Sequence, residues 1–410
     1  MSRVAVLVLL AIALLASTAS ATRRVYRVDV ATEEQLSLLV SFSERHNLDL
    51  WTEPALGPVH VLIPEKAAHA FAALPLVSSV FIDDVDVLIG EERLRMAQNE
   101  GKAEFFEEYQ TLDSIYAWVN NLAASYPSLV STFVIGTSYE GRQILGLKIR
   151  ANRGATREFF FNGGIHSREW VAPATVLYMA NELVTKYGSD ANVTSIVDRL
   201  DITIIPVLNP DGYVFTHAVG GDRLWRKNRQ PNAGSICMGT DVNRNWPFQW
   251  NTGGSSAAPC SDSYHGPSSQ SAPETKAVVA YLSTNKARLA GYIDFHAFSQ
   301  LLMYPWGYTT QLPADNAALL RVGTAAANAL RAVYGTAYDV GSIANIIYVA
   351  SGSSADYTYG ALNVRWSYAY ELRDTGRFGF LLPADQIIPS GIETFESLKV
   401  IALQGILASE

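Results

Sequence analysis

The sequence predicts an α/β protein with a central β-sheet flanked by helices, preceded by a small α+β unit. From Leu112 onward, apolar strand-like runs alternate with helical patterns, which is typical of a largely buried sheet. Residues 22–95 carry their own pattern of short strands and helices, followed by a charged stretch with little apolar periodicity. The chain has 410 residues, more than one domain usually needs, so two folding units are expected.

The first unit, residues 22–95, is expected to be a ferredoxin-like open sandwich. Val25 to Val30 alternates as a strand does, and Thr32 with Gln35 forms the capping box of a following helix. The later elements are a strand over 58–63, a helix over 64–74, and strands over 77–82 and 85–89. This order is close to β-α-β-β-α-β.

Residues 1–21 have the pattern of a secretory signal peptide. Arg3 supplies the positive charge, an apolar core of 13 residues begins at Val4, and small residues precede a cut after Ala21. A membrane anchor is the alternative, but 13 residues are too few to cross a bilayer. We therefore expect a secreted, extracellular protein without a membrane partner.

Residues 96–108 are predicted to link the first unit to a larger body over 109–410. Arg93, Arg95 and Lys102 lie in or near this stretch, and each offers a cut site to a trypsin-like protease. A leading unit on a cleavable linker suggests a zymogen, activated by a cut between Arg95 and Lys102. Two permanently joined domains are the alternative.

The amino-acid composition limits the kinds of binding partner that are expected. The net charge is -8 without a long basic run, so nucleic acid is not an expected partner, and the protein is expected to act as a monomer. Cys237 and Cys260 are the two cysteines, and in a secreted chain such a pair suggests a disulfide. That bridge would stabilise the fold by roughly 3 kcal/mol. Two unrelated free thiols are the alternative.

The most informative short motif is His166 with Glu169. A nitrogen and an oxygen ligand three residues apart can close on one cation, and His296, in a strand-like run, is the best candidate for a third ligand. Two histidines and one carboxylate leave a zinc position open for water, which is the hydrolytic arrangement. Alone, the motif could also be a helix N-terminus where the glutamate favours the dipole.

Several further motifs, in one order along the chain, resemble the secreted zinc metallocarboxypeptidases of the A/B digestive, pro-enzyme type. The matching stretches are HSREW at 166–170, NPDGY at 209–213, RLWRK at 223–227, DVNRNW at 241–246, FH at 295–296, IY at 347–348 and YELRDTG at 370–376. The resemblance covers essentially the whole chain. It implies a mixed central sheet, one Zn²⁺ per catalytic domain on His166, Glu169 and His296, and hydrolysis of the C-terminal peptide bond of peptides and proteins.

The same resemblance implies the catalytic roles. Glu371 would be the general base that takes a proton from the zinc-bound water, although a structural ion pair with Arg373 is the alternative. Arg226 would stabilise the oxyanion. Without the resemblance, the arginines at 223, 226 and 229 read as one solvated face of a helical turn. Asp241 would orient the metal ligand His166.

Substrate contacts are implied in the same way. Asn243 and Arg244 match the pair that grips the free C-terminal carboxylate, for which the planar fork of arginine is suited. Tyr348 matches the mobile tyrosine that caps this carboxylate, and Arg168 matches a contact upstream of the cut. Phe298 stands where many relatives have tyrosine, so a hydroxyl contact is absent there.

The pocket for the terminal side chain should be roomy and uncharged. Ala355, where B-type enzymes carry aspartate, and Ala369 are both small, which favours bulky aliphatic or aromatic ends. An unpaired Lys or Arg would cost several kcal/mol to desolvate there. Asp294, if it reached the rim, would keep a mixed or basic preference open. The expected lining residues are Met303, Gly307, Ile343, Ala355 and Ala369.

Two other functions stay open. A non-peptidase zinc amidase or deacylase could use the same scaffold, although Asn243, Arg244 and Tyr348 would then have no role. A non-catalytic binding protein would be expected to have lost a ligand or the base, and this sequence retains both.

Overall fold

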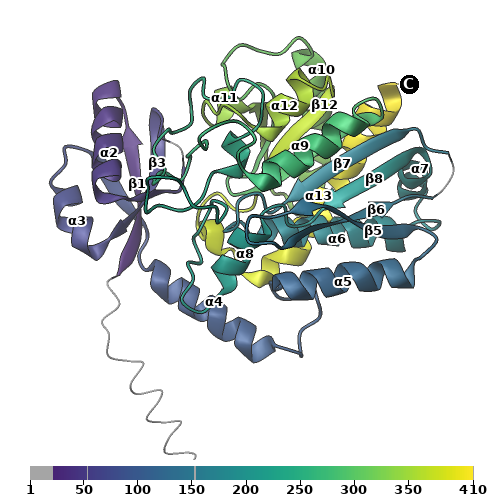
Figure 1. Cartoon of the computed structure of the whole chain (residues 1–410), viewed down its shortest axis with the longest axis horizontal. Coiled ribbons are helices and arrows are strands. Elements are labelled where there is room, and N and C mark those ends of the chain that lie inside the picture. Colours follow the sequence, from purple (N-terminus) through teal and green to yellow (C-terminus); the bar gives the residue numbers. More distant parts are fainter. Residues whose placement is uncertain (1–21, 53, 152–153, 410) are drawn as a thin grey trace, which may run out of the picture. The chain divides into compact units, whose positions relative to one another are not determined.

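The computed structural model describes residues 22–52, 54–151 and 154–409, so the predicted signal peptide at 1–21 lies outside the described residues (Figure 1). The chain divides into two compact units, residues 1–93 and 94–410. Within the part of the chain that the structure describes, no helix has the length and apolar character needed to cross a membrane.

Within the described residues, the first unit contains a four-stranded antiparallel sheet, two complete helices and the start of helix α4 (Val85–Asn99). Its strands are β1 (Arg23–Val30), β2 (Asp49–Leu50), β3 (Gly57–Pro64) and β4 (Val77–Ile82), in the order β2-β3-β1-β4, and its helices are α2 (Glu33–His46) and α3 (Glu65–Ala72). Val28, Leu39 and Phe71 belong to its buried core. The order is β-α-β-β-α-β, to which the predicted order was close.

Two of the predicted boundaries in this unit were wrong. The second strand is β2, whose two residues are too few to give a periodic signal. Residues 85–89 are the start of helix α4 (Val85–Asn99) and not a strand. The cause is Asp84, whose carboxylate accepts hydrogen bonds from the backbone N–H of Asp86 (3.0 Å) and Val87 (3.1 Å). This N-cap outweighs the strand preference of the valines and isoleucine that follow.

The second unit contains the predicted mixed sheet, which has eight strands within the described residues. Within the described residues the strand order is β11-β10-β12-β9-β7-β8-β6-β5. The four inner strands, β12, β9, β7 and β8, are parallel, whereas β10 and β6 pair antiparallel with their inner neighbours. The bounds are β5 (Val130–Thr137), β6 (Gln143–Ile149), β7 (Arg157–Gly163), β8 (Leu200–Ile205), β9 (Leu289–Ala297), β10 (Leu301–Tyr304), β11 (Asp339–Ser342) and β12 (Trp366–Leu372).

Helices flank this sheet. Helix α9 lies over one face in Figure 1, where Val278 and Leu282 join Phe160 and Tyr292 in one buried cluster. Helix α13 contacts both α6 and α10. The helices are α5 (Leu112–Ser125), α6 (Val171–Thr185), α7 (Ala191–Arg199), α8 (Pro210–His217), α9 (Pro273–Asn285), α10 (Asn316–Tyr334), α11 (Ile343–Ile346), α12 (Ser354–Gly360) and α13 (Ile387–Val400).

The register of the inner strands determines which side chains meet at the carboxyl edge of the sheet. In the parallel pair β9–β12, Glu371 lies beside His296 and Ala369 lies beside Asp294. The antiparallel neighbour β10 places Met303 beside Ala369. Ligand sites of open α/β sheets lie beyond the carboxyl ends of the strands, and β7 and β9 both end here.

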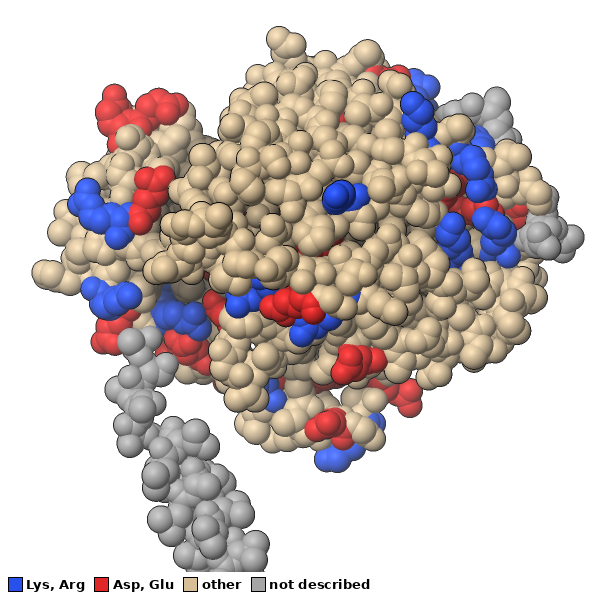
Figure 2. Space-filling model, in the orientation of Figure 1, with Lys and Arg blue, Asp and Glu red and all other residues tan. Residues whose placement is uncertain are grey.

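Two further features concern covalent structure and surface charge. Cys237 and Cys260 form the predicted disulfide, with their Cα atoms 5.0 Å apart. On the face shown in Figure 2, lysines and arginines occur in several separate places with acidic residues among them. In that view they are not gathered into a groove of the kind that follows a nucleic-acid backbone.

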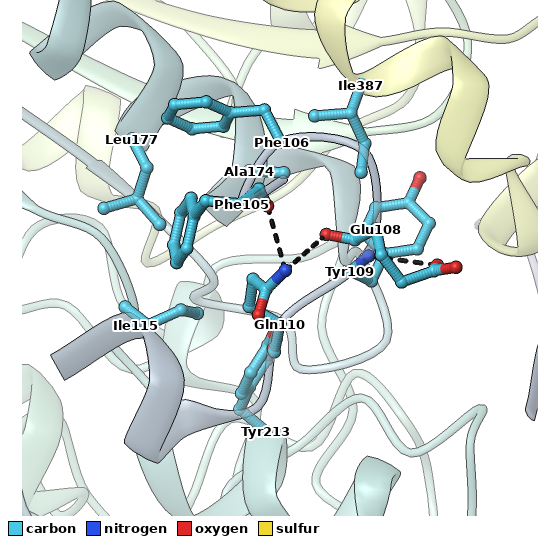
Figure 3. Close-up of a pocket in the computed structure, with 10 residues that line it drawn as sticks. All are labelled: Phe105, Phe106, Glu108, Tyr109, Gln110, Ile115, Ala174, Leu177, Tyr213 and Ile387. Carbon is cyan, nitrogen blue, oxygen red and sulfur yellow. Dashed lines mark hydrogen bonds between the residues drawn. The ribbon is translucent and has the colours of Figure 1, made fainter. Parts of the chain in front are cut away.

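The segment that leads into the body is anchored by aromatic side chains (Figure 3). The Phe105 ring stacks on Trp118 at 5.0 Å between centroids, and Phe106 meets Tyr178 edge-on at 5.3 Å. The Tyr109 hydroxyl donates a hydrogen bond to the Leu382 carbonyl (2.8 Å). The chain is therefore fixed to the second unit from residue 105 onward.

Candidate active site

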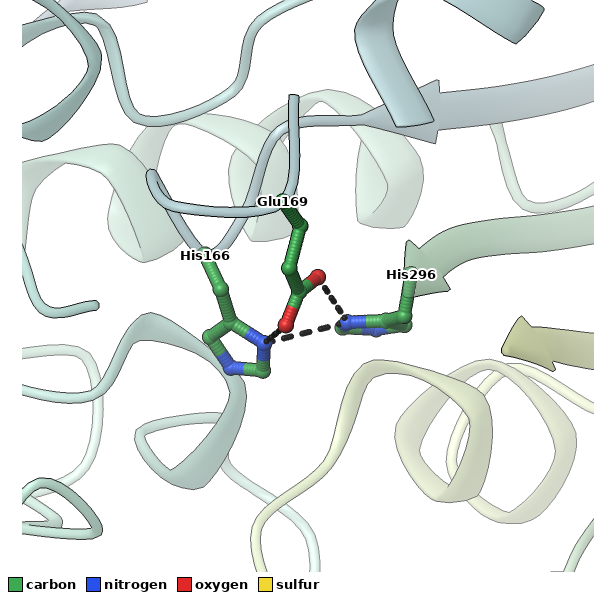
Figure 4. Close-up of side chains that lie close together, drawn as sticks. All are labelled: His166, Glu169 and His296. Carbon is green, nitrogen blue, oxygen red and sulfur yellow. Dashed lines mark hydrogen bonds and ion pairs between the residues drawn. The ribbon is translucent and has the colours of Figure 1, made fainter. Parts of the chain in front are cut away.

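Three buried side chains converge on one point (Figure 4). Nδ1 of His166 lies 2.8 Å from one oxygen of Glu169, and Nδ1 of His296 lies 3.1 Å from the other. The two Nδ1 atoms are 3.1 Å apart. Burial raises the pKa of the Glu169 carboxyl, but the two histidine rings lower it below its usual range. This set of nitrogen and oxygen donors fits a zinc ion, which three protein ligands hold with one position open.

Both histidines turn their other ring nitrogen toward a buried carboxylate. Nε2 of His166 lies 3.1 Å from Asp241, its predicted partner, and Nε2 of His296 lies 3.0 Å from Asp294. Such partners orient metal-binding histidines. Asp294 was not predicted at this position, although Asp294 and His296 are two residues apart in a strand and so share a face.

Asp294 does not reach the pocket rim, so that expectation was wrong. Its side chain is buried beneath His296 and does not belong to the pocket lining. One oxygen accepts from the Asn162 amide (2.6 Å) and the other from the Ser354 hydroxyl (2.6 Å). A carboxylate engaged in this way cannot pair with a substrate Lys or Arg, which removes the argument for a basic preference.

Asp241 connects several parts of the site. Arg226 donates to one of its oxygens through Nε (3.1 Å) and Nη2 (2.8 Å), while His166 faces the other. Burial would raise the pKa of Asp241, but Arg226 and His166 hold it well below its usual value. The backbone N–H of Asn243 also donates to Asp241 (2.8 Å), which caps the short 3₁₀ turn that follows. One carboxylate therefore orients a metal ligand, a guanidinium and a turn.

Glu371 lies in the wall of the same pocket, at the end of β12. Burial raises the pKa of its carboxyl to about 8. Of the neighbouring groups, His296 lowers this pKa and Glu169 raises it. The alternative of an ion pair with Arg373 is contradicted, because Arg373 pairs with Glu393 at 2.5 Å. A carboxylate beside the metal ligands with a pKa near neutral suits proton transfer.

The three arginines at 223, 226 and 229 do not form a solvated helical face, because this segment is not helical. Arg223 is buried and stacks over the Trp170 ring at 3.5 Å, and Arg229 stacks over Phe215 at 3.7 Å. Arg226 is the member of this set that turns toward the metal ligands, with Nη1 4.0 Å from Glu169.

One pocket joins the metal ligands to the predicted substrate contacts, with about 420 Å³ of space including its open mouth. Four lining residues were not predicted: Ile347 and Ala350 lie in loop sequence that gives no periodic signal, and Ser353 and Ser354 lie at the start of the short helix α12. The lining is His166, Asn243, Arg244, His296, Met303, Ile343, Ile347, Tyr348, Ala350, Ser353, Ser354, Ala355, Ala369 and Glu371.

Two predicted substrate contacts lie outside this lining. Gly307 is behind the wall, where its N–H donates to Asp356 (2.8 Å) and a side chain would meet the Ala350 carbonyl. Arg168 is buried, and its guanidinium lies 4.1 Å from the centre of the Phe380 ring. Phe298 packs on the same ring at 5.0 Å.

Comparisons with known proteins match both units. Residues 115–397 match the family model described as zinc carboxypeptidase, and residues 26–92 match the carboxypeptidase activation peptide. Carboxypeptidase A2 of Mus musculus is 42% identical over 381 residues, covering 90% of each chain. Carboxypeptidase A1 of Sus scrofa is 39% identical over 391 residues, covering 92% of each. The crystal structure of carboxypeptidase A from Helicoverpa armigera superposes with a TM-score of 0.86 at 31% identity, covering 95% of this chain and 99% of that one.

Proposed function

Because this chain belongs to the zinc carboxypeptidase family, we propose that Glu371, Arg226 and the Asn243–Arg244 pair act together on the C-terminal peptide bond of a peptide or protein. The activation-peptide match and the A-type relatives make it the zymogen of a zinc carboxypeptidase with A-like specificity. The observation that carries the proposal is the single pocket, which combines metal ligands, a carboxylate base and an apolar end.

Zinc held by His166, Glu169 and His296 would polarise the scissile carbonyl and lower the pKa of an attacking water toward 7. Glu371 accepts the proton of that water and passes it to the leaving amine. Burial raises the pKa of Glu371, which favours uptake of the proton from the water. Arg226 faces the developing oxyanion, and its two hydrogen bonds to Asp241 fix it in advance.

The preference for a terminal over an internal peptide bond follows from the part of the pocket wall that contains Arg244. Arg244 lines the pocket, and its guanidinium is held by the carbonyls of Gly254 (3.1 Å) and Asn243 (3.2 Å). A positioned arginine fork binds a carboxylate at two points, so a free C-terminus is selected over an internal peptide bond. Tyr348, whose ring centre lies 5.8 Å from the Arg244 guanidinium, caps the bound carboxylate.

The apolar end would select the terminal side chain. Met303, Ile343, Ala355 and Ala369 form one buried cluster with Leu301. The alanines leave room for a bulky aliphatic or aromatic side chain. A Lys or Arg would be desolvated there without a counter-charge, at a cost of several kcal/mol.

Activation would require a cut in or near the linker, and the two arginines that precede it are poorly accessible to a protease. Arg93 and Arg95 lie inside helix α4, which a protease would have to unwind. The Arg95 guanidinium is also paired with the buried Glu108 (3.2 Å), to which the Asn99 amide donates (3.1 Å).

Lys102 is the better site for a trypsin-like protease. It is exposed, lies beyond the end of α4 and follows Gly101, which has a φ of 69° in a turn. Exposed turns of this kind are preferred sites of proteolytic nicking. We therefore expect cleavage of the Lys102–Ala103 bond, after which Phe105 and Phe106 hold the new N-terminus on the body. Removal of the first unit by this cut would then activate the enzyme. Secretion directed by residues 1–21 would bring the zymogen to such a protease.

The proposal is tested with the purified zymogen and limited trypsin. N-terminal sequencing should find Ala103, Lys102→Gln should resist this cut, and Arg95→Gln should be cut as the wild type is. The activated protein should hold one zinc and release the last residue of a peptide ending in Phe much faster than that of its C-terminal amide. Zinc binding without release from either peptide would refute the peptidase and favour an amidase or deacylase.

A further inference from the structure

Asp241 and Asp294, the carboxylates that face the two metal-binding histidines, differ in their other partners. Asp241 shares its charge between His166 and the Arg226 guanidinium. In the described part of the chain, the one ion pair of Asp294 is with His296. Its remaining partners are neutral, namely the Asn162 amide and the Ser354 hydroxyl, each at 2.6 Å. The charge of Asp294 is therefore directed at one ring.

We infer that Asp294 is a positioning residue that holds the His296 proton on Nε2 and thereby slows zinc loss; this inference rests on the proposed function. With the proton on Nε2, Nδ1 keeps its lone pair toward His166 and Glu169, where the metal would lie. The two neutral donors fill other acceptor positions of Asp294 and prevent the carboxylate from turning.

The same proton also determines what Asn243 can do. The Asn243 amide nitrogen lies 3.1 Å from Nε2 of His296, and its oxygen accepts from the Ser354 backbone N–H (2.9 Å). When Nε2 carries the proton, it cannot accept from Asn243, whose amide hydrogens remain available to a substrate carboxylate. If the proton moved to Nδ1, Nε2 would accept from Asn243. The metal ligand and the substrate clamp would then both be weakened.

The test is the rate at which zinc leaves the trypsin-activated protein into an excess of a chromogenic chelator. Asp294→Asn keeps the size of the side chain but removes its charge, and partners of this kind are worth about 10- to 100-fold in metal affinity. We expect zinc release to be faster by about that factor. With excess zinc present, we also expect a raised KM for a peptide ending in Phe.

Asp201→Asn is the matched control. Asp201 is a buried carboxylate on strand β8, which β7 separates from β9, and it is paired with Arg150 and Arg288 and not with a metal ligand. This variant should lose stability but release zinc at the wild-type rate. Equal release rates for Asp294→Asn and wild type would overturn the inference. Absence of zinc from the wild type would refute the proposed function instead.

If Asp294→Asn does not fold, the inference can still be tested on the wild-type protein. Proton NMR of the zinc-loaded protein with ¹⁵N-labelled histidine should show two strongly downfield Nε2 protons, one for His166 and one for His296. The His296 signal is identified by comparison with Asp241→Asn, which perturbs the other. A missing His296 signal would overturn the inference.

Discussion

The two ends of the pocket are built in opposite ways. At the metal end, side chains are fixed by several polar contacts each, as Asp241 is by His166, Arg226 and the Asn243 backbone. At the other end, Ala355 and Ala369 contribute little beyond their small size. This difference indicates that a polar network determines the chemistry and that free volume determines the substrate. Changes at the metal end should abolish activity, whereas changes at the apolar end should redirect it.

The largest effect is expected from Glu371→Gln, which tests the metal end. Loss of a general base should lower kcat by about 10²- to 10⁴-fold, while zinc stays bound because Glu371 is not a ligand. Steady-state kinetics on a peptide ending in Phe, with zinc analysis of the same sample, measures both. A kcat within tenfold of the wild type would exclude Glu371 as the base.

A smaller loss should follow Arg244→Ala, at the boundary between the two ends. A hydrogen bond to a charged group contributes about 1.5–3 kcal/mol, which corresponds to roughly 10- to 150-fold in kcat/KM. The loss should appear for peptides with a free C-terminus. The slow background on C-terminal amides should be unchanged, and an equal loss on both substrates would show that Arg244 does not bind the carboxylate.

Ala355→Ile tests the apolar end. The larger side chain fills space that an aromatic ring would occupy, and misfit of a methylene or more costs about 1–3 kcal/mol. The ratio of kcat/KM for peptides ending in Phe over those ending in Val should therefore fall by about tenfold or more. Zinc content should be that of the wild type. An unchanged ratio would mean that Ala355 does not line the pocket for the terminal side chain.

The smallest effect on activity concerns Asp356, behind the apolar end. Its carboxyl accepts from the N–H groups of Gly307 (2.8 Å) and Tyr308 (2.9 Å), and burial raises its pKa to about 7. A raised pKa means that the folded state favours the neutral acid. That stabilisation is fully present below the ordinary pKa of 3.8 and is lost as the pH rises through about 7.

Denaturant unfolding of the wild type and Asp356→Asn at several pH values measures this effect. Between pH 4 and pH 7.5 the wild-type free energy of unfolding should fall, by an amount on the order of a few kcal/mol, relative to the variant. Parallel curves for the two proteins would contradict a raised pKa.

The sequence was informative where function depends on local motifs. His166 with Glu169, and Asn243 with Arg244, are close in the chain, so their residue types and spacing could be interpreted together. Asp294 shares a strand face with His296, but the contacts that hold its carboxylate away from the pocket rim come from other elements. Asn162 comes from β7 and Ser354 from α12, and neither contact can be inferred from spacing.

The fold shows the same difference between features that depend on local sequence and features that depend on distant contacts. Alternating runs predicted the long strands and helices, but β2 is too short for any period, and an aspartate cap turned residues 85–89 into a helix. The arginines at 223 and 229 have a helical spacing in a segment that is not helical. Arg223 stacks on Trp170 and Arg229 stacks on Phe215, and neither partner can be inferred from a helical spacing.

One measurement tests both ends of the pocket together: C-terminal release from matched peptides ending in Phe, Leu, Lys, Arg and Glu, before and after limited trypsin, with and without a zinc chelator. Release of Phe and Leu alone, only after trypsin, and abolished by the chelator, is the predicted result. Comparable release of Lys or Arg would contradict the assignment of the apolar end. Release before trypsin, or release that persists in the chelator, would contradict the zymogen or the metal end.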